Sequence, residues 1–540
     1  MIGADAVVRA IHKLGTDHIF GIVSIHNMPI FDAINRDGTI KIIDCRHEVA
    51  ATHAADGYAR ATGKIGIVIA STGPGTTNTV TGLYEAQYAS SPVLLITGQA
   101  ETRFYGKGQG YVHEAEDQLP MLRTVTRRAE SIRSAEQIES TILMVAADIA
   151  YGRPSSGAVE IPIDLQYQDV QTAETRLDTP ALPAPQSVDD AVDLIAGSRK
   201  RVIIAGGGTI RSNASGELVR LAEKLGAPVF TTHNGRGVIP EDHPLCLGNL
   251  YQARKLHAAI IDAELTIAIG TRFQVGVSGS GALLQPPGKL LHIDIDPSVV
   301  DLVHRSDASV IGDARSVLQS IDSAMNFESG DEDFAGRVQE ANQGLRQTLR
   351  NRLGPDYEGI MNTIRDQLPR DGLIVRDTTV PAYNFANHLL PVYEPRTFIG
   401  PTSAAIGPGL PLAIGAATAT GRKTVVIHGD GGFMLHATEL ATAAQYQLPL
   451  VVCVFNDGGY GVLRGLQSAQ FDGRIGDTDL GFVDFAAFAE SMGVRGETAT
   501  SLKEFQDAFI SAMAASGPCL INIDMRKLEP MKGSILPVEE

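Results

Sequence analysis

The sequence has no tryptophan and only four cysteines in 540 residues, and 6% of its residues are aromatic. No Cys-x-x-Cys pair and no metal-ligand spacing occurs among the cysteines, which are Cys45, Cys246, Cys453 and Cys519. A disulfide framework and a cysteine-bound zinc site are therefore not indicated. Cys45 and Cys453 lie in apolar runs and are expected to be small core residues.

Basic residues are also fewer than acidic ones. The chain has 45 Lys and Arg against 62 Asp and Glu, a net charge of −17, and no basic run. This balance argues against nucleic acid and anionic membranes as partners. No uninterrupted apolar run reaches membrane-spanning length, and the first residues lack a signal-peptide pattern. We therefore expect a cytoplasmic protein with no nucleic-acid or membrane partner.

What the sequence does contain is a repeated alternation of apolar strand-like runs with helical segments. This rhythm predicts an α/β fold of three doubly wound parallel-sheet domains, at 1–170, 188–325 and 359–530. Five strand-like runs are expected in the first unit and four in each of the others. Residues 169–187, rich in Pro, Thr and Ala, are predicted to be a linker, and the charged segment 326–358 a solvated helix and connection.

The most informative stretch is Gly429–Gly461, GDGGFMLHATELATAAQYQLPLVVCVFNDGGYG. It follows the β-branched run TVVIH and includes a second apolar run, LPLVVCVF. Between the runs, Leu435, Leu440 and Ala444 are spaced to bury one face of a helix. The stretch therefore predicts one βαβ unit, whose two acidic turns lie together at the carboxyl edge of a parallel sheet.

That arrangement would place Asp430 beside Asn456, although 25 residues separate them. A carboxylate, an amide oxygen and the Gly458 carbonyl suit Mg²⁺, which prefers oxygen ligands. The glycines would let a diphosphate approach backbone N–H groups. The simpler alternative is an ordinary strand-to-helix turn with an N-cap aspartate. Because the two motifs occur at matching ends of one βαβ unit, we favour the metal site.

This stretch resembles the diphosphate–Mg²⁺ motif of thiamine diphosphate (ThDP) enzymes, in the group of acetolactate synthase, benzoylformate decarboxylase, benzaldehyde lyase and pyruvate oxidase. The family pattern has Asn-Asn where this chain has Asn456-Asp457, so the metal-binding asparagine is kept. The resemblance covers nearly the whole chain and implies pyrimidine-binding, central and diphosphate-binding domains. It implies that ThDP is held by Thr378, Thr379, Gly429, Asp430, Gly431, Gly432, Asn456, Gly458, Tyr460 and Gly461, with Mg²⁺ on Asp430, Asn456 and Gly458.

Glu48 lies in Arg46-His47-Glu48, at the start of the helical segment VAATHAADGYARATG. On its own, a carboxylate at a helix start is explained by favourable electrostatics. The resemblance implies instead that Glu48 is the catalytic glutamate that binds the pyrimidine N1′ of ThDP. It also implies that the Ala404 carbonyl accepts from the 4′-amino group and that Ile406 wedges between the two rings. A plain core position is the alternative for Ile406.

The resemblance places a substrate pocket at Ser24, His26, Gly73 and His113. A lone histidine is usually structural, but His26 aligns with an active-site histidine of benzaldehyde lyase. His113 takes the place of a pocket glutamine common to acetolactate synthase and its relatives. Imidazoles in the pocket would relay protons near neutral pH, so both are predicted to be catalytic. Where benzoylformate decarboxylases carry a histidine, this chain has Ser71.

Two glycine loops of the central unit, 206–212 and 270–276, resemble the nucleotide-facing loops of flavin-binding relatives. Those relatives carry a Gly-Met-His-Gly-type segment between the loops, and this chain has GNLYQARK at 248–255. We therefore expect FAD to be absent or vestigial.

The resemblance implies ThDP- and Mg²⁺-dependent cleavage or formation of C–C bonds in small 2-oxo acids or acyloins, by a carboligase or lyase. A simple 2-oxo acid decarboxylase of the benzoylformate type is the alternative. A non-catalytic ThDP-fold protein and a nucleotide-linked α/β enzyme rank lower. The family geometry also implies a homodimer or homotetramer with active sites between subunits, so that Glu48 and Asp430 of one chain serve different sites.

Overall fold

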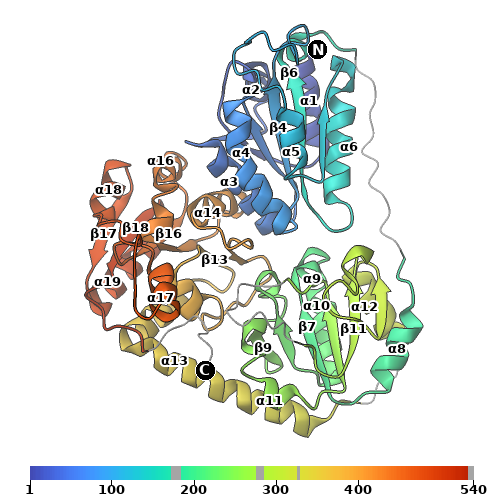
Figure 1. The fold of residues 1–540 in the computed structure, drawn as a ribbon, viewed down its shortest axis with the longest axis vertical. Coiled ribbons are helices and arrows are strands. Elements are labelled where there is room, and N and C mark those ends of the chain that lie inside the picture. Colours follow the sequence, from blue (N-terminus) through green and yellow to red (C-terminus); the bar gives the residue numbers. More distant parts are fainter. Residues whose placement is uncertain (172–183, 275–284, 325–328, 533–540) are drawn as a thin grey trace.

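The computed structural model describes residues 1–171, 184–274, 285–324 and 329–532 (Figure 1). Three six-stranded sheets follow one another along the chain, and all neighbouring strands in them are parallel. The predicted class, three α/β units with parallel sheets, is confirmed. Most of the predicted linker, residues 172–183, lies outside the described residues.

The first sheet has the strand order β2-β1-β3-β4-β6-β5. Its strands are β1 (His18–Gly21), β2 (Lys41–Asp44), β3 (Gly66–Ala70), β4 (Val93–Gln99), β5 (Arg128–Ser131) and β6 (Ser156–Pro162). The helices are α1 (Gly3–Lys13), α2 (Met28–Asp37), α3 (Glu48–Thr62), α4 (Pro74–Tyr88), α5 (Gln118–Arg123), α6 (Ile138–Ala150) and α7 (Ile163–Tyr167). Helices α1, α2 and α6 bury one face of the sheet, and α3 and α4 bury the other.

The second sheet has the order β12-β11-β10-β7-β8-β9. Its strands are β7 (Arg201–Ala205), β8 (Val229–Thr231), β9 (Cys246–Asn249), β10 (Leu265–Ile269), β11 (Lys289–Asp294) and β12 (Ala308–Ile311). The helices are α8 (Val188–Ala196), α9 (Gly207–Arg211), α10 (Ser215–Leu225), α11 (His257–Ile260) and α12 (Ala314–Ala324).

The third sheet has the order β14-β13-β15-β16-β18-β17. Its strands are β13 (Leu373–Arg376), β14 (Phe398–Ile399), β15 (Thr424–Gly429), β16 (Leu450–Asn456), β17 (Arg495–Ala499) and β18 (Cys519–Asp524). The helices are α14 (Gly409–Thr420), α15 (Asp430–Phe433), α16 (Leu440–Gln445), α17 (Gly461–Gln470), α18 (Phe485–Ser491) and α19 (Leu502–Ala514).

Five strands that the apolar pattern does not predict, β5, β9, β12, β14 and β17, all lie at sheet edges. Strand β5 has the sequence RAES and β17 has RGETA, and both are partly exposed. The predicted central strand β3, GIVIA, is completely buried. Because only the inner strands of a parallel sheet are covered on both faces, only they are apolar throughout.

The prediction of a single helix between β15 and β16 is wrong. The structure has α15, a short 3₁₀ turn at Ala437–Glu439, and α16 in its place. Leu435 lies in the break and is 51% exposed, whereas Leu440 is buried. In one continuous helix both leucines would lie on the buried face. The break leaves Leu440 in the core, as predicted, and Leu435 at the surface, contrary to the prediction.

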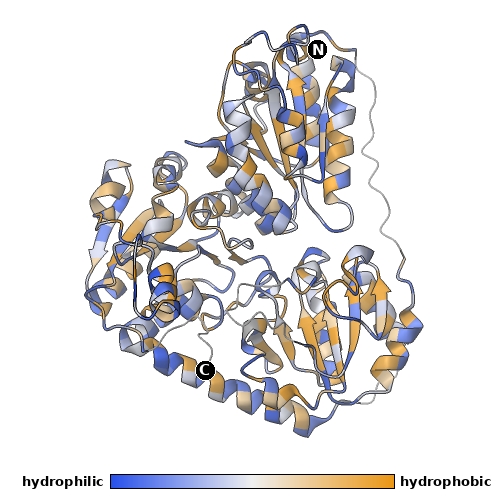
Figure 2. Cartoon of the chain, in the orientation of Figure 1, coloured by the Kyte–Doolittle hydropathy of each residue, from blue (hydrophilic) through white to orange (hydrophobic). Residues whose placement is uncertain are grey.

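The charged connection is the long helix α13 (Glu332–Gln367), which runs from the second unit to the third (Figure 1). It is interrupted at Gly354, where φ is 73° and a proline follows. Figure 2 shows hydrophilic residues along α13 and mainly hydrophobic strands in the sheets. Within the described part of the chain, no helix has the length and apolar character needed to cross a membrane.

Helices α3 and α14 join the first and third units at backbone distance. A Cβ atom on Gly57 of α3 would overlap the carbonyl oxygen of Leu412, and one on Gly415 of α14 would overlap that of Ala54. One hydrophobic cluster continues from the first sheet through these helices into the third. The two units therefore share a core.

We expect Gly415→Ala to lower the free energy of unfolding by more than about 2 kcal/mol, because the added methyl group has no space between the helices. The matched control is Gly344→Ala in α13, where an added Cβ meets no atom within 4 Å. The control should be neutral or slightly stabilised, since alanine favours a helix over glycine. Urea unfolding of both variants measures the difference, and equal stabilities would contradict this view of the interface.

Candidate active site

The carboxyl edge of the third sheet brings two of the predicted ligands together. Strands β15 and β16 are neighbours, and Gly429 pairs with Phe455 in their register. Asp430 directly follows Gly429, and Asn456 directly follows Phe455, so the two lie beside one another at the same edge. This is the juxtaposition that the βαβ pattern predicts.

Asp430 is the first residue of α15 and is only 5% exposed. Burial raises the pKa of its carboxyl group to about 6, and the negative charge of Asp457 contributes to the shift. The Asp457 carboxylate is itself partly buried, with Arg464 Nη1 at 3.4 Å. This edge of the sheet thus gathers negative charge that a cation would offset.

Asn456 has a fixed amide orientation. Its Nδ2 donates to the Val483 carbonyl at 2.9 Å and to Asn522 Oδ1 at 3.0 Å. Its Oδ1 therefore lies on the opposite side, where it accepts from Gly458 N at 3.3 Å. The Gly458 carbonyl accepts from Leu480 N at 2.9 Å and keeps a second lone pair. A carboxylate, an amide oxygen and a carbonyl fit Mg²⁺.

The glycines of this edge are needed for close packing around the acidic turns. A Cβ on Gly431 would lie 2.7 Å from the Tyr460 ring, and one on Gly432 would overlap the Asp377 carboxylate. On Gly461, the first residue of α17, it would overlap the Asp457 carboxylate.

Thr379 packs in the same way against β15. A Cβ on Gly429 would lie 2.5 Å from Thr379 Oγ1. The glycine spacing of the motif thus has a structural cause inside the protein, in addition to the expected approach of a diphosphate.

The turn at 404–407 holds an exposed isoleucine in place. Ala404 has φ +64°, an unusual value for a residue with a side chain, and Ile406 is 39% exposed. The Asp377 carboxylate accepts from Gly407 N at 2.9 and 3.1 Å, and Thr378 Oγ1 donates at 2.9 Å to the carbonyl before Ile406. Ile406 is therefore not a core residue, and backbone strain of this kind is common in binding sites.

Glu48 begins α3, directly after the turn that follows β2. Its Oε2 accepts from Asn78 Nδ2 at 3.0 Å and lies 3.9 Å from His47 Nδ1. The amides of Arg46 and His47 donate to Glu439 Oε1 at 2.8 and 3.1 Å, which fixes the loop before Glu48. Neither Asn78 nor Glu439 is predictable as a partner from the sequence, because both contacts depend on tertiary packing.

His26 and His113 come together around Ser71. The Ser71 Oγ lies 3.4 Å from Nδ1 of His26 and 3.5 Å from Nδ1 of His113, and the ring centroids are 5.2 Å apart. His26 is buried and His113 is exposed. Burial lowers the pKa of His26, and the neighbouring His113 lowers it further. At neutral pH, His26 is therefore an uncharged donor and acceptor.

The remaining pocket residues support this cluster. Gly73 has φ +56°, and a Cβ there would lie 2.5 Å from the His113 carbonyl oxygen. Gln118, which sequence reasoning did not select, accepts from Gly73 N at 2.8 Å. Ser24 Oγ accepts from His26 N at 3.3 Å. Hydrogen bonds thus hold the backbone of His26 and that of Gly73, which packs against His113.

The described residues fall into two groups within one chain. One group contains Glu48 and the histidines, and the other contains Asp430 and Asn456. Across the ranges that the structure describes, no hydrogen bond or ion pair joins a member of one group to a member of the other.

The central glycine loops pack on each other. A Cβ on Gly206 would overlap the Gly270 carbonyl oxygen, and one on Gly208 would lie 2.7 Å from the Gly270 Cα. Packing alone therefore accounts for these glycines. Residues 275–276 of the second loop lie outside the described residues.

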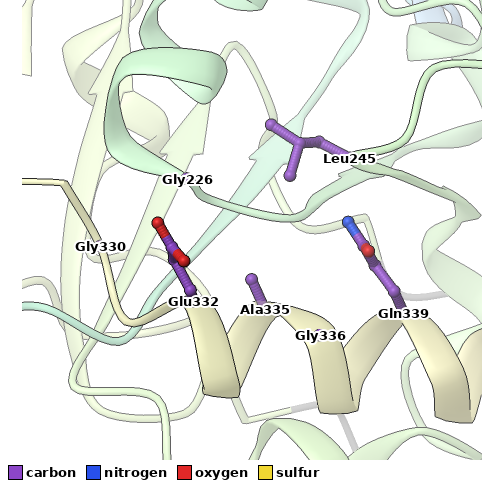
Figure 3. Close-up of a pocket in the computed structure, with 7 residues that line it drawn as sticks. All are labelled: Gly226, Leu245, Gly330, Glu332, Ala335, Gly336 and Gln339. Carbon is purple, nitrogen blue, oxygen red and sulfur yellow. The ribbon is translucent and has the colours of Figure 1, made fainter.

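A hollow of about 230 Å³ lies elsewhere, beside the start of α13 (Figure 3). Its lining includes Gly226, Leu245, Gly330, Ala335, Glu332 and Gln339. It contains none of the predicted site residues and only two polar side chains. It lacks the converging polar groups of an active site.

Three family models match the chain in succession. They are the thiamine pyrophosphate enzyme N-terminal TPP-binding domain at residues 1–121, the central domain at 188–321, and the C-terminal TPP-binding domain at 381–523. The two TPP-binding models cover the units that carry the two groups of candidate site residues.

Curated relatives agree with these models. The probable acetolactate synthase large subunit of Methanocaldococcus jannaschii is 33% identical, over 97% of this chain and 92% of the relative. The acetolactate synthase isozyme 2 large subunit of Escherichia coli is 31% identical, over 98% of this chain and 96% of the relative. The acetolactate synthase of Mycobacterium bovis is 31% identical, over 97% and 88%. The chain belongs to the thiamine pyrophosphate-dependent enzyme family, in the acetolactate synthase group.

Proposed function

We propose that this protein is a Mg²⁺- and ThDP-dependent carboligase that decarboxylates one 2-oxo acid and joins the remaining acyl unit to a second carbonyl compound. The observation that carries the proposal is the pairing of Asp430 with an oriented Asn456 amide at one sheet edge. Acetolactate synthase relatives over nearly the full length favour ligation. They do not favour the alternative, a simple decarboxylase of the benzoylformate type.

In this proposal, Asp430, Asn456 and the Gly458 carbonyl hold Mg²⁺, and the surrounding backbone amides hold the diphosphate. Thr378, Thr379, Tyr460 and the glycines of the two turns complete the cradle. When bound, ThDP supplies an electron sink for negative charge that develops at the substrate carbonyl carbon. The protein's own contribution is to bind, orient and manage protons.

Glu48 would hold and exchange the proton of the pyrimidine N1′ in this arrangement. The carbonyl of Ala404, an exposed residue with left-handed backbone, would accept from the 4′-amino group. The half-exposed Ile406 side chain would separate the two rings. Since no hydrogen bond or ion pair among the described residues joins Glu48 to Asp430 within one chain, we propose that a homodimer or homotetramer completes each site.

His26, Ser71 and His113 would handle protons at the substrate oxygen. The lowered pKa of His26 keeps its imidazole neutral, so that it can both donate and accept near pH 7. The exposed His113 would meet the second carbonyl compound. A small 2-oxo acid is the substrate class that such a pocket suits.

The product distinguishes the two enzyme classes. We expect the protein with ThDP and Mg²⁺ to convert two molecules of pyruvate mainly into one CO₂ and one C–C ligated 2-hydroxy-3-oxo acid, acetolactate in this case, identified by mass spectrometry. Benzoylformate with acceptor aldehydes should be tested in parallel. Acetaldehyde as the main product from pyruvate would favour the decarboxylase. If the protein neither turned over any of these substrates nor bound ThDP, the proposed function would be rejected.

Glu48→Gln should bind ThDP but turn over at least about 100-fold more slowly, because the amide cannot exchange the N1′ proton. Calorimetric ThDP binding and turnover are measured on the same preparation. The matched control is Glu136→Gln, an exposed carboxylate at the start of the 3₁₀ turn Ala135–Gln137. A fully active Glu48→Gln protein would refute the assigned role.

Asp430→Asn should weaken Mg²⁺-dependent ThDP binding by at least about tenfold, because it removes the anionic ligand. Chelation of Mg²⁺ should release ThDP from the parent protein, and added Mg²⁺ should restore binding. Asp472→Asn, whose side chain is 93% exposed, is the control and should bind as the parent does. Parent-like binding by Asp430→Asn would remove this residue from the metal site.

A further inference from the structure

The segment 400–403 of the third unit lies immediately before the turn that carries Ala404 and Ile406, and both other units contact it. Arg60 of α3 donates from Nη1 to the Gly400 carbonyl at 2.7 Å. Asn234, in the 3₁₀ turn His233–Gly235 of the second unit, donates from Nδ2 to Thr402 Oγ1 at 3.1 Å. Glu85 of α4 contacts it as well.

Glu85 is 1% exposed, and its carboxylate accepts hydrogen bonds from two backbone amides of this segment. Oε1 accepts from Thr402 N at 2.6 Å, and Oε2 accepts from Ser403 N at 3.1 Å and from the Ser403 hydroxyl group. Arg60 Nη2 lies 2.8 Å from Oε1. Hydrogen bonds from backbone N–H groups to an ionised carboxylate are short and strong.

The charges around Glu85 keep it ionised. Burial raises the pKa of Glu85, but Arg60 and the bonds from Thr402 and Ser403 outweigh it, so that the net pKa is lowered. Arg60 also pairs with the buried Asp56 at 2.5 Å. Two buried carboxylates therefore share one guanidinium, and the backbone amides of 402 and 403 supply the remaining compensation.

Together with Asp377, this contact fixes both ends of the turn. Glu85 holds the amides of residues 402 and 403, and Asp377 holds the amide of Gly407. Between these two carboxylates lie the left-handed Ala404 and the exposed Ile406. A strained, exposed turn keeps one conformation only where its surroundings fix it. A general contribution to stability is a weak explanation, since buried ion pairs often contribute little net stability.

We propose that Glu85, supported by Arg60, is a positioning residue that sets the Ala404 carbonyl and the Ile406 side chain for the pyrimidine and thiazolium rings of the cofactor. This inference rests on the proposed function, because it assumes that the turn meets ThDP. Glu85 belongs to the pyrimidine-binding unit of the same chain, yet it acts on the diphosphate-binding unit. It touches neither the metal ligands nor the histidine cluster in the described contacts.

The test separates the two halves of the cofactor. Calorimetry on full-length protein freed of cofactor measures the affinity for ThDP with Mg²⁺ and, separately, for inorganic diphosphate with Mg²⁺. Glu85→Gln should bind ThDP at least about tenfold more weakly, because an amide cannot accept all four bonds. Its affinity for diphosphate should be unchanged, and its kcat for pyruvate should fall while KM stays constant.

Glu139→Gln is the matched control, since Glu139 is a buried carboxylate of the same unit paired with Arg9 at 3.1 Å and Lys13 at 2.5 Å, away from the turn. It should leave both affinities unchanged. Ser403→Ala removes one bond to Glu85 and should give a smaller loss in the same direction, even if Glu85→Gln does not fold.

Parent-like ThDP binding by Glu85→Gln, or by Ser403→Ala if the first variant does not fold, would overturn the positioning role. Equal losses for ThDP and diphosphate would overturn it as well, by indicating a general structural defect. A parent protein that binds diphosphate but not ThDP would instead reject the proposed function itself.

Discussion

The contact between α3 and α14 is the constraint on which the rest of the molecule depends. Glycines at Gly57 and Gly415 let the two helix backbones approach so closely that any side chain there would overlap a carbonyl group. The first and third units consequently share one hydrophobic core. Since Glu48 begins α3 and the turn of Ile406 precedes α14, this contact also sets where both parts of the candidate site lie.

Negative charge gathered at the edge of the third sheet is the second organising feature. Asp430 and Asp457 meet at the edge of the third sheet with Arg464 near only one of them, and burial raises the pKa of Asp430 to about 6. Asp377 and Glu85, in contrast, hold the backbone amides of the turn at 402–407, and Glu85 also pairs with Arg60. The protein thus uses some buried carboxylates to hold its backbone in place and leaves others available to a cation.

The apolar pattern predicted the inner strands, because these are buried on both faces and need hydrophobic residues throughout. It missed edge strands such as β5 and β17, most of whose residues are partly or fully exposed. It also placed Leu435 in a helix that the chain interrupts. Periodicity records burial on a regular element, so it carries little information where an element is exposed or broken.

The sequence by itself determined the fold class, the juxtaposition of Asp430 with Asn456, and the family resemblance, because these depend on local spacing and on the rules of parallel sheets. Only the tertiary structure decided that Ser71 lies between His26 and His113, that Asn78 contacts Glu48, and that Glu85 holds the turn before Ala404. These contacts join residues 30 to more than 300 positions apart. No local pattern encodes contacts across such separations in sequence, since these contacts follow from how complete units pack against one another.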